Sequence, residues 1–381
     1  MTTSIEQSAN EAKRVAEEHA IQYMNDYDLI KELYLPAENK IILQRSDKKK
    51  ICRFCDGEAP TATFAKEAHA LPEALGNNSL FSEYECDRCN GQFGESIEND
   101  FGKWSKPMRT MMRIKGKNGV PTIKWSSSNR NRIEFISNQL EISTLEDEPF
   151  FEIDEPNKTV NFKIKREPYI PLGVLKTFYK IAITLIPEDE IINFIDAITW
   201  LKTPYSSTSE IKIPVIHAFI PGPIPNNKIT LRLHRLKNID ASLPYMFLVL
   251  MYGNDMFQIF IPSSKDSGIS GKNIEIPYYP TPWDVVEWPY GQIQRRLLFL
   301  SGKETIRDEE FKISMSFEQI KQHDTQRIIA LAEEAKSLNA SEEIVNHLKC
   351  GRSTRALGAI STTQNNSHLL DLVEKIKLAE S

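Results

Sequence analysis

Two cysteine pairs with the same spacing constrain this chain more than any other feature. Cys52 and Cys55 are separated by two residues, and Cys86 and Cys89 repeat that gap further along the chain. The sequence holds 5 cysteines, so Cys350 is the one that belongs to neither pair. A two-residue gap lets a tight turn aim both thiolates at one ion, and two such turns complete a tetrahedral zinc site. We therefore expect the four paired cysteines to bind one structural Zn²⁺ ion.

A pair of disulfide bonds is the alternative explanation of the two cysteine pairs. The polar start of the chain has no signal-peptide core, and Cys350 is left over, which together argue against an oxidising compartment. A zinc ion held by four thiolates has no open position for water or substrate, so it contributes to folding rather than to catalysis. The zinc site alone therefore does not specify a function.

Length and composition indicate a folded, soluble protein. A chain of 381 residues is long enough for two domains, and its 40% hydrophobic and 26% charged residues are ordinary for a globular protein. No run of about 18 apolar residues predicts a membrane helix, so we expect a cytoplasmic location and no membrane partner. The net charge of -5 argues against general attraction to nucleic acid, so phosphate contacts would need a local basic patch.

The segment between and beside the cysteine pairs holds one of the chain's 7 histidines, His69. Residues 64–71 have extended character, Pro72 ends them, and Gly76 with the two asparagines after it predicts a turn. Residues 88–101 then predict a helix that opens in the second cysteine pair. A strand with a histidine, a loop with an asparagine and a helix beginning Cys-x-x-Cys-Asn is the order expected of a one-metal phosphodiesterase site.

Residues 51–104 resemble the HNH endonucleases, in the subgroup with flanking zinc knuckles. The matching elements are Cys52-x-x-Cys55, the stretch KEAHALPEALGN, and Cys86-x-x-Cys89-Asn90 followed by the FG and IE of the helix. The resemblance implies a zinc-stapled, treble-clef-like ββα-metal module around one catalytic Mg²⁺ or Mn²⁺ ion.

The resemblance also implies a role for three side chains. His69 would be the general base, Asn90 would be a ligand of the catalytic ion, and Asn77 or Asn78 would be the loop asparagine that orients the histidine. Hydrolysis of a phosphodiester needs an activated water and neutralisation of the charge on the phosphoryl oxygens. Histidine suits the first task because its ordinary pKa of about 6.5 leaves it largely neutral near pH 7. An asparagine oxygen suits a hard divalent ion.

The sequence departs from the family pattern directly before the histidine. Many family members place a metal-binding acidic residue or a second histidine there, whereas this chain has Ala68. Glu67 would point to the other face of an ideal strand, so it can replace that ligand only if the backbone bulges. Otherwise Glu98 in the helix, or a water molecule, fills the position. The alternative is an inert zinc ribbon in which His69 is only a satisfied polar residue.

A basic run follows the predicted helix. Residues 101–132 contain 9 positive charges and no acidic residue, with Trp104 and Trp125 among them. A solvated basic face is the alternative reading, but the position beside the nuclease-like motif favours contact with phosphates. The residues that we expect to bind nucleic acid are Lys103, Lys106, Arg109, Arg113, Lys115 and Lys117. The expected partner is DNA, bound through its backbone, with RNA not excluded.

The rest of the chain predicts a larger mixed α+β domain with an antiparallel sheet and C-terminal helices. The expected segments are helices over 1–50, the HNH domain over 51–120, the α+β domain over 121–312 and a helical region over 313–381. The helices of the first segment, up to about Leu33, are expected to pack against the zinc module. The overall fold class is therefore α+β.

Within that larger domain, residues 172–185 predict a helix, and a second amphipathic helix follows Pro187. The stretches RIEFI, FFEI, VNFKIK, KITLRLHRL, YMFLVLMYGNDMFQIFIP and NIEIPYY predict strands, with Gly253-Asn254 as a tight hairpin turn. His217 and His234 lie in strand patterns and are expected to be structural. Residues 315–339, 341–350 and 367–379 predict helices, and the polar stretch 351–366 between the last two predicts a flexible linker.

The first hypothesis for function is a metal-dependent HNH endonuclease that hydrolyses phosphodiester bonds in DNA. The layout is similar to that of anti-phage effectors and mobile-element nucleases, in which a larger module accompanies the nuclease. A homodimer would allow both strands to be cut, and an activating partner is a further expectation. The second hypothesis is a non-catalytic zinc-ribbon module that binds nucleic acid or a protein partner.

Overall fold

A computed structural model describes most of the chain: residues 2–124, 132–136, 139–143, 150–208, 212–223, 227–239, 242–269, 276–286, 288–320, 325–349, 353–362 and 369–380. The chain forms two compact units, each built from separated segments. The first unit comprises Met1–Ser105, Ile114–Gly119 and Glu167–Arg307, and the second comprises Lys106–Arg113, Val120–Arg166 and Asp308–Ser381. Helices and antiparallel sheets occur together, which confirms the α+β class.

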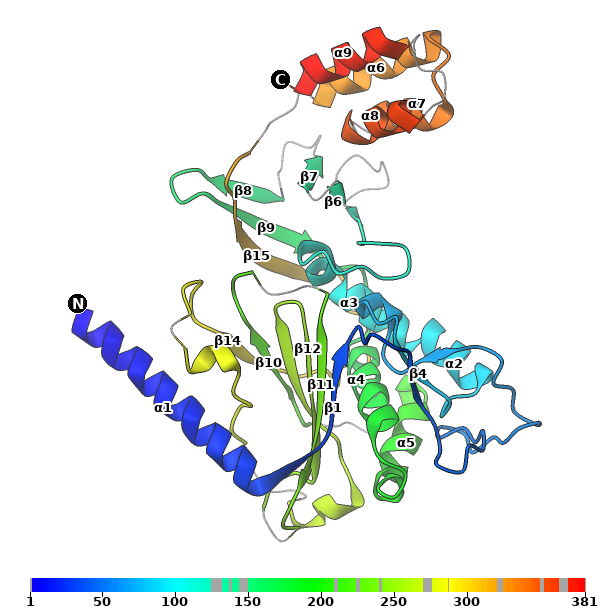
Figure 1. Cartoon of the computed structure of the whole chain (residues 1–381), viewed down its shortest axis with the longest axis vertical. Helices are drawn as coiled ribbons and strands as arrows, with labels where there is room; N and C mark the ends of the chain where they lie inside the picture. Colours follow the sequence, from blue (N-terminus) through cyan, green and yellow to red (C-terminus); the bar gives the residue numbers. More distant parts are fainter. Residues whose placement is uncertain are drawn as a thin grey trace. The chain divides into compact units, whose positions relative to one another are not determined.

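The first unit is built on a six-stranded antiparallel sheet with the order β1-β11-β12-β13-β10-β14 (Figure 1). Its strands are Tyr27–Leu35, Ile229–Leu236, Met246–Tyr252, Asp255–Phe260, Val215–Phe219 and Gln294–Leu298 in that order. Tyr252 pairs with Asp255, so Gly253 and Asn254 form the predicted two-residue turn. Gly253 has a φ of 53°, the left-handed conformation that such a turn favours. The sequence also predicted a strand in residues 273–279, but 276–279 are not a strand and the remainder lies outside the described residues.

Aromatic contacts cover both faces of this sheet. On one face, the ring of Phe257 in β13 lies 5.0 Å from that of Phe178 and 5.9 Å from that of Trp104. On the other face, Tyr23 of helix α1 (Thr2–Asp26) receives a 2.6 Å hydrogen bond from the Gln258 amide and packs on Phe247. The sheet is therefore the middle layer of the unit.

The N-terminal segment differs from its prediction. Helix α1 ends at Asp26, and the next nine residues, YDLIKELYL, form the edge strand β1 instead of continuing as helix. The sequence predicted that this segment packs against the zinc module. Instead, the side chains of His19 and Tyr23 in α1 contact residues 277–279. Pairing with β11 satisfies the backbone groups on one side of the strand, apart from an irregularity between Leu29 and Lys31, and this outweighs a helical preference that is weak over so short a stretch.

The segment that carries the four paired cysteines, residues 41–111, forms a small sheet followed by two helices. Strands β2 (Ile41–Leu43), β4 (Leu80–Ser82) and β3 (Ala68–His69) pair in that order. The sequence predicted a single helix over 88–101, but the structure has α2 (Asp87–Glu95) and α3 (Ile97–Met111). Ser96 separates them because its φ of -112° and ψ of -92° lie outside the helical region.

Helix α4 (Pro171–Leu185) lies where the sequence predicts it, and all 15 of its residues are buried. Pro171 at the first helical position has no N–H to leave unsatisfied. The Asp100 carboxylate of α3 accepts hydrogen bonds from the backbone N–H of Ile170 (3.1 Å) and from the Tyr205 hydroxyl (2.9 Å). A carboxylate is stabilised at a helix N-terminus by the unpaired N–H groups there.

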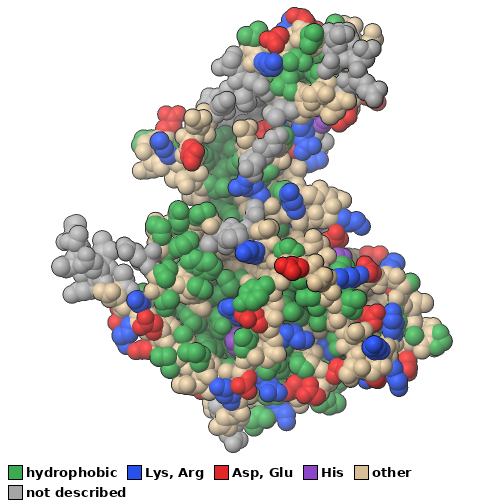
Figure 2. All heavy atoms as spheres, viewed as in Figure 1, with side chains coloured by type: hydrophobic (Ala, Val, Ile, Leu, Met, Phe, Trp, Pro, Cys, Tyr) green, Lys and Arg blue, Asp and Glu red, His purple; other side chains and the backbone are tan. Residues whose placement is uncertain are grey.

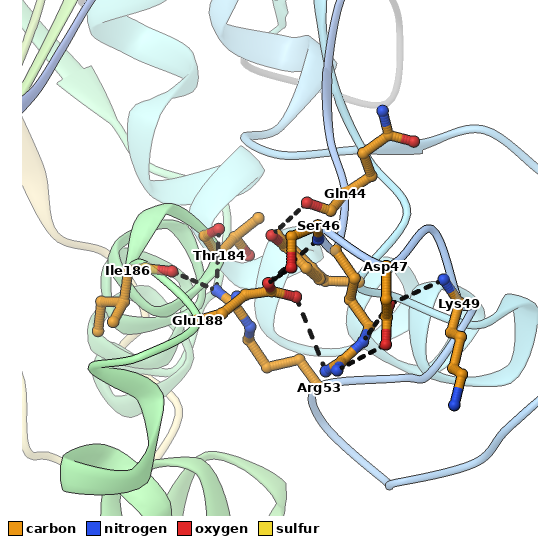
Figure 3. Close-up of polar contacts among 10 residues, drawn as sticks. Gln44, Ser46, Asp47, Lys49, Arg53, Thr184, Ile186 and Glu188 are labelled. Atoms are coloured by element: carbon orange, nitrogen blue, oxygen red, sulfur yellow. Dashed lines mark hydrogen bonds and ion pairs between the residues drawn. The ribbon is translucent and has the colours of Figure 1, made fainter.

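The first zinc knuckle satisfies the other end of α4 (Figure 3). The Arg53 guanidinium donates to the carbonyls of Ile183 (2.7 Å), Thr184 (3.2 Å) and Ile186 (2.9 Å). These are carbonyls that a helix leaves without an internal partner at its C-terminus. Burial lowers the pKa of Arg53 to about 10, which still leaves it charged at neutral pH. Figure 3 also shows Glu188, just after α4, accepting hydrogen bonds from the backbone and hydroxyl of Ser46.

The second unit contains two small antiparallel sheets and a cluster of helices. Strands β15 (Glu310–Ser316), β9 (Thr159–Lys165) and β8 (Phe151–Asp154) form one sheet, and β5 (Ile123–Lys124), β6 (Arg132–Ile136) and β7 (Gln139–Ser143) form the other. The helices are α6 (Thr325–Ser337), α7 (Glu342–Lys349), α8 (Ser353–Thr362) and α9 (Leu370–Glu380), which share one apolar core.

Two predictions for the second unit are wrong. Met315 and Ser316 end strand β15 rather than beginning a helix. Residues 353–362, expected in a flexible linker, form helix α8, because Ala356 and Ile360 are buried among the apolar residues of the neighbouring helices. Their four-residue spacing places both on one helical face, a pattern that the many polar residues around them obscure. Among the described helices, none is long and apolar enough to cross a membrane.

The close approach of α3 and α4 predicts the effect of a substitution at Gly173. A Cβ at this position would lie 2.4 Å from Asp100 Oδ2 and 2.6 Å from the Tyr205 hydroxyl. We expect Gly173→Ala to lower the free energy of unfolding by about 1–3 kcal/mol, because the carboxylate must move away from the helix N-terminus. Gly102→Ala is the control, since a Cβ there meets nothing within 4 Å and alanine favours helix. Equal stability of Gly173→Ala and wild type in urea unfolding would contradict the packing described.

Candidate active site and zinc site

The four paired cysteines come together as the sequence predicts. One donor atom from each lies within 4.8 Å of the others, and Cys55 Sγ is 3.7 Å from Cys86 Sγ. Tetrahedral zinc with bonds of about 2.3 Å requires sulfur–sulfur separations of about 3.8 Å, so the spacing fits that ion. Cys86 is the N-cap residue of α2 and Cys89 lies in its first turn, while Cys52 and Cys55 lie in the turn that Cys52 N–H closes on Gly57 O at 2.8 Å.

The electrostatics of the cluster favour a bound cation. The hydrogen bond with Cys89 lowers the pKa of the Cys52 thiol to about 5, so one thiolate forms readily. The same hydrogen bond raises the pKa of Cys89, and burial raises that of Cys86. Further thiolates in so small a space repel the first one, and a divalent ion removes that repulsion. The donor set is therefore suited to a metal such as zinc.

His69 lies in strand β3, between the cysteine pairs. It pairs with Phe81 of β4, and the two rings are 4.7 Å apart. Its side chain is 27% exposed, and Nε2 lies 3.9 Å from a carboxylate oxygen of Glu73. Burial lowers the pKa of His69, against the opposing effect of the Glu73 carboxylate. The imidazole is thus accessible from one side and neutral at pH 7.

Asn77 anchors the loop between β3 and β4. Its side chain has no exposed surface, and its oxygen accepts hydrogen bonds from the N–H groups of Ser79 (3.3 Å) and Leu80 (2.9 Å). Its amide nitrogen donates to the carbonyls of Leu71 (3.0 Å) and Leu80 (2.8 Å), which uses both hydrogens. The same nitrogen is 3.5 Å from His69 Nδ1, so Asn77 contacts the imidazole without a third hydrogen to donate to it. Asn78, the alternative from the sequence, is exposed.

The two acidic side chains considered as replacements for the ligand missing at Ala68 are both paired with lysines. Ala68 itself is buried, and Glu67 forms an exposed ion pair with Lys40. Glu98 accepts a 2.9 Å hydrogen bond from the ammonium of Lys180 in α4. Among the described residues, the cysteine cluster is the one group of three or more His, Cys, Asp or Glu side chains placed to hold a metal.

Asn90 follows Cys89 in the first turn of α2 and is half-buried. Its backbone N–H donates to Cys86 O at 2.9 Å, which is the first helical hydrogen bond after the knuckle. The second zinc knuckle therefore fixes the backbone of Asn90 directly. The structure brings His69 and Asn77 into contact and holds Asn90 through the cysteine cluster.

Three functional candidates were not predicted. Glu73 comes within reach of His69 because η1 (Glu73–Leu75) begins right after Pro72, an i,i+4 spacing that the sequence displays. Lys180 contacts the backbone of His69, and Glu85 lies 3.0 Å from the Lys180 ammonium. Lys180 is distant in sequence, and a lysine in an apolar helix carries no signal that identifies its partners.

The six predicted nucleic-acid contacts differ in exposure. Lys115 and Lys117 are exposed, and Lys103 and Lys106 are half-buried. Arg109 is buried, with 7% of its surface exposed, and so is Trp104. Arg113 is exposed and lies 5.3 Å over the Phe135 ring. Trp125 lies outside the described residues, and Arg132, part of the same basic run, is buried 2.6 Å from Glu134.

On the face of the molecule shown in Figure 2, the positive side chains of the described residues are not concentrated in one patch. Among the described residues on the face shown in Figure 2, Lys and Arg side chains are interspersed with Asp and Glu. This is consistent with the net charge of -5. On this face, the view in Figure 2 shows no extended basic surface among the residues described.

The two histidines of the sheet are structural, as predicted. His234 is buried and stacks on Phe247, with ring centres 4.7 Å apart. His217 is buried, and Arg296 donates to its Nδ1 at 3.0 Å while its Nε2 lies 2.7 Å from Asp255. Because Nδ1 accepts a hydrogen bond, Nε2 carries the proton and donates to the carboxylate. Both imidazoles are therefore buried and contact other side chains of the core.

Comparison with known proteins agrees with this geometry. No curated protein matches the chain, and no solved structure matches it. The family model of the HNH endonucleases matches residues 52–105, a segment that contains the four clustered cysteines, His69, Asn77 and Asn90. The match to the HNH endonucleases is therefore confined to residues 52–105, which are similar to that family.

Proposed function

We propose that this protein is a metal-dependent endonuclease that hydrolyses phosphodiester bonds in DNA. The observation that carries the proposal is His69: it is the one histidine in the segment that matches the HNH family, its ring is partly exposed, and burial lowers its pKa. A neutral imidazole can accept a proton from water at physiological pH, whereas an imidazolium cannot. His69 is therefore the proposed general base.

Asn90 is the proposed ligand of a catalytic Mg²⁺ or Mn²⁺ ion. Such an ion, when bound, neutralises charge on the scissile phosphate and on the leaving oxygen. An amide oxygen is a suitable donor for a hard ion and leaves coordination positions for water and phosphate. The four cysteines hold the proposed structural Zn²⁺ and fix the backbone of Asn90 through its hydrogen bond to Cys86.

Lysine side chains supply the proposed contacts to the DNA backbone. Lys115 and Lys117 are exposed, and Lys103 and Lys106 are partly so. Lysines that neutralise phosphates give affinity with little sequence preference and strong dependence on salt. RNA shares this backbone charge, so it is compared with DNA in the same assay.

A zinc module that binds nucleic acid without cutting it is the second candidate. Ala68 favours it, because that position lacks the metal-binding side chain of many family members, and because Glu67 and Glu98 are paired with lysines instead. A single comparison of wild type with a His69 variant separates the two candidates.

The cysteine cluster predicts the metal content of the purified protein. We expect about one zinc ion per chain by elemental analysis, and its loss in Cys86→Ser, because three thiolates bind zinc much more weakly than four. The variant should also unfold at a lower temperature than wild type. Cys350→Ser is the matched control, since Cys350 belongs to neither pair. Wild type without zinc, or Cys86→Ser with a full complement, would contradict the zinc assignment.

The role of His69 predicts the outcome of a plasmid assay. Supercoiled DNA incubated with wild type and Mg²⁺ or Mn²⁺ should be nicked or linearised, and His69→Ala should lower the rate by about 100-fold or more, as expected on loss of a general base. His347→Ala, which removes a histidine of helix α7 in the second unit, should cut like wild type. Equal rates for wild type and His69→Ala would rule out the assigned base. DNA binding by both proteins without cleavage would favour the second candidate.

A further inference from the structure

Helix α4 places one buried ammonium against the candidate active site. Lys180 is 1% exposed, and its Nζ donates to His69 O at 3.2 Å and to Glu98 Oε1 at 2.9 Å. The same ammonium forms an ion pair with Glu85 Oε2 at 3.0 Å. The side chain therefore touches strand β3, helix α3 and the residue that precedes Cys86.

The His69 carbonyl depends on this contact. Ala70 N–H donates to Leu80 O, so His69 and Phe81 form a non-hydrogen-bonded pair of the antiparallel ladder. In such a pair the backbone groups point away from the partner strand, and the carbonyl of His69 is thus directed to Lys180 rather than to β4. Strand β3 has two residues, so it offers few other backbone hydrogen bonds to fix the histidine.

The charges around Lys180 make its position well defined. Burial disfavours the ammonium, but the carboxylates of Glu85 and Glu98 outweigh that effect and raise the pKa of Lys180. The buried ammonium thus has two hydrogen-bond acceptors, His69 O and Glu98 Oε1, and a third oxygen, of Glu85, at ion-pair distance.

We propose that Lys180 is a positioning residue for the phosphodiester hydrolysis described above: it fixes the backbone of His69 relative to α3 and to the entry of the second zinc knuckle. The inference deepens the proposed function and rests on it. Lys180 does not contact substrate in this arrangement, because its ammonium is enclosed. Its effect is exerted through His69, whose ring must meet the attacking water at hydrogen-bond distance.

Lys176 offers a matched control on the same helix. It is equally buried, and its ammonium donates to the carbonyl of Leu201 (3.2 Å), to that of Thr203 and to the Thr208 hydroxyl (3.2 Å). It therefore holds the end of helix α5 (Ile195–Lys202) instead of the histidine. Replacing either lysine by methionine removes a buried ammonium with three oxygen contacts from α4, and the Lys180 change alone frees the His69 carbonyl.

The test measures plasmid cleavage in Mg²⁺ by Lys180→Met, by Lys176→Met and by the double variant Lys180→Met/Glu85→Gln. The double variant also removes the Glu85 carboxylate, which the single variant would leave buried without its lysine. If Lys180→Met does not fold, the double variant is measured in its place. We expect the Lys180 variants to lose about 10- to 100-fold in kcat with KM within about twofold of wild type, because DNA contacts are unchanged. Lys176→Met should keep wild-type kcat.

A second readout does not depend on cleavage. The imidazole C–H resonances of His69, assigned by their absence in His69→Ala, report its position against the Phe81 ring by NMR. They should shift in the Lys180 variants and stay in place in Lys176→Met. Unchanged resonances and kcat in a folded Lys180 variant, or equal losses in the Lys176 variant, would overturn the proposal. If wild type does not cut DNA, the proposed function fails, and the resonance shift still decides whether Lys180 positions His69.

Discussion

Helix α4 is held at both ends and at its centre by the segment that carries the cysteine cluster, and the architecture of the first unit depends on this attachment. Asp100 satisfies the N-terminus of the helix, Arg53 satisfies its C-terminus, and Lys180 joins the middle to the carboxylates of Glu85 and Glu98. Each contact pairs a charged group with buried polar atoms that would be costly to leave alone. These contacts fix the position of a helix whose residues are all buried.

This attachment gives the region after Tyr169 a structural role in the candidate active site. Its sequence carries no chemical motif, yet its first helix contributes an ammonium to the backbone of the candidate base. The same helix packs through Phe178 on the six-stranded sheet, so the small HNH segment and the larger sheet share one core. The HNH-like segment is short, and the core that it shares with the sheet supplies the rigidity that positioning of His69 requires.

The sequence predicted the structure correctly where the pattern lies within a short stretch of the chain. Paired cysteines, the Gly253-Asn254 turn and the apolar spacing of α4 are short patterns with one physical meaning, and the structure confirms each of them. Residues 27–35 were misread because their partner strand, β11, lies some two hundred residues away along the chain. The contacts of Lys180 were invisible for the same reason, since nothing in the spacing of a buried lysine identifies which carboxylates will meet it. The proposed catalytic roles of His69 and Asn90 rest on the similarity of residues 52–105 to the HNH endonucleases.

Native-state hydrogen exchange measured with and without zinc is the most direct test of the claim that α4 and the segment that carries the cysteine cluster form one cooperative structure. If they do, the slowest amides of α2 and of α4 open with the same free energy, and removing the metal with a chelator lowers both by the same amount. If α4 keeps its full protection while α2 loses protection on metal removal, the two are independent elements and the attachment described is not what organises this protein.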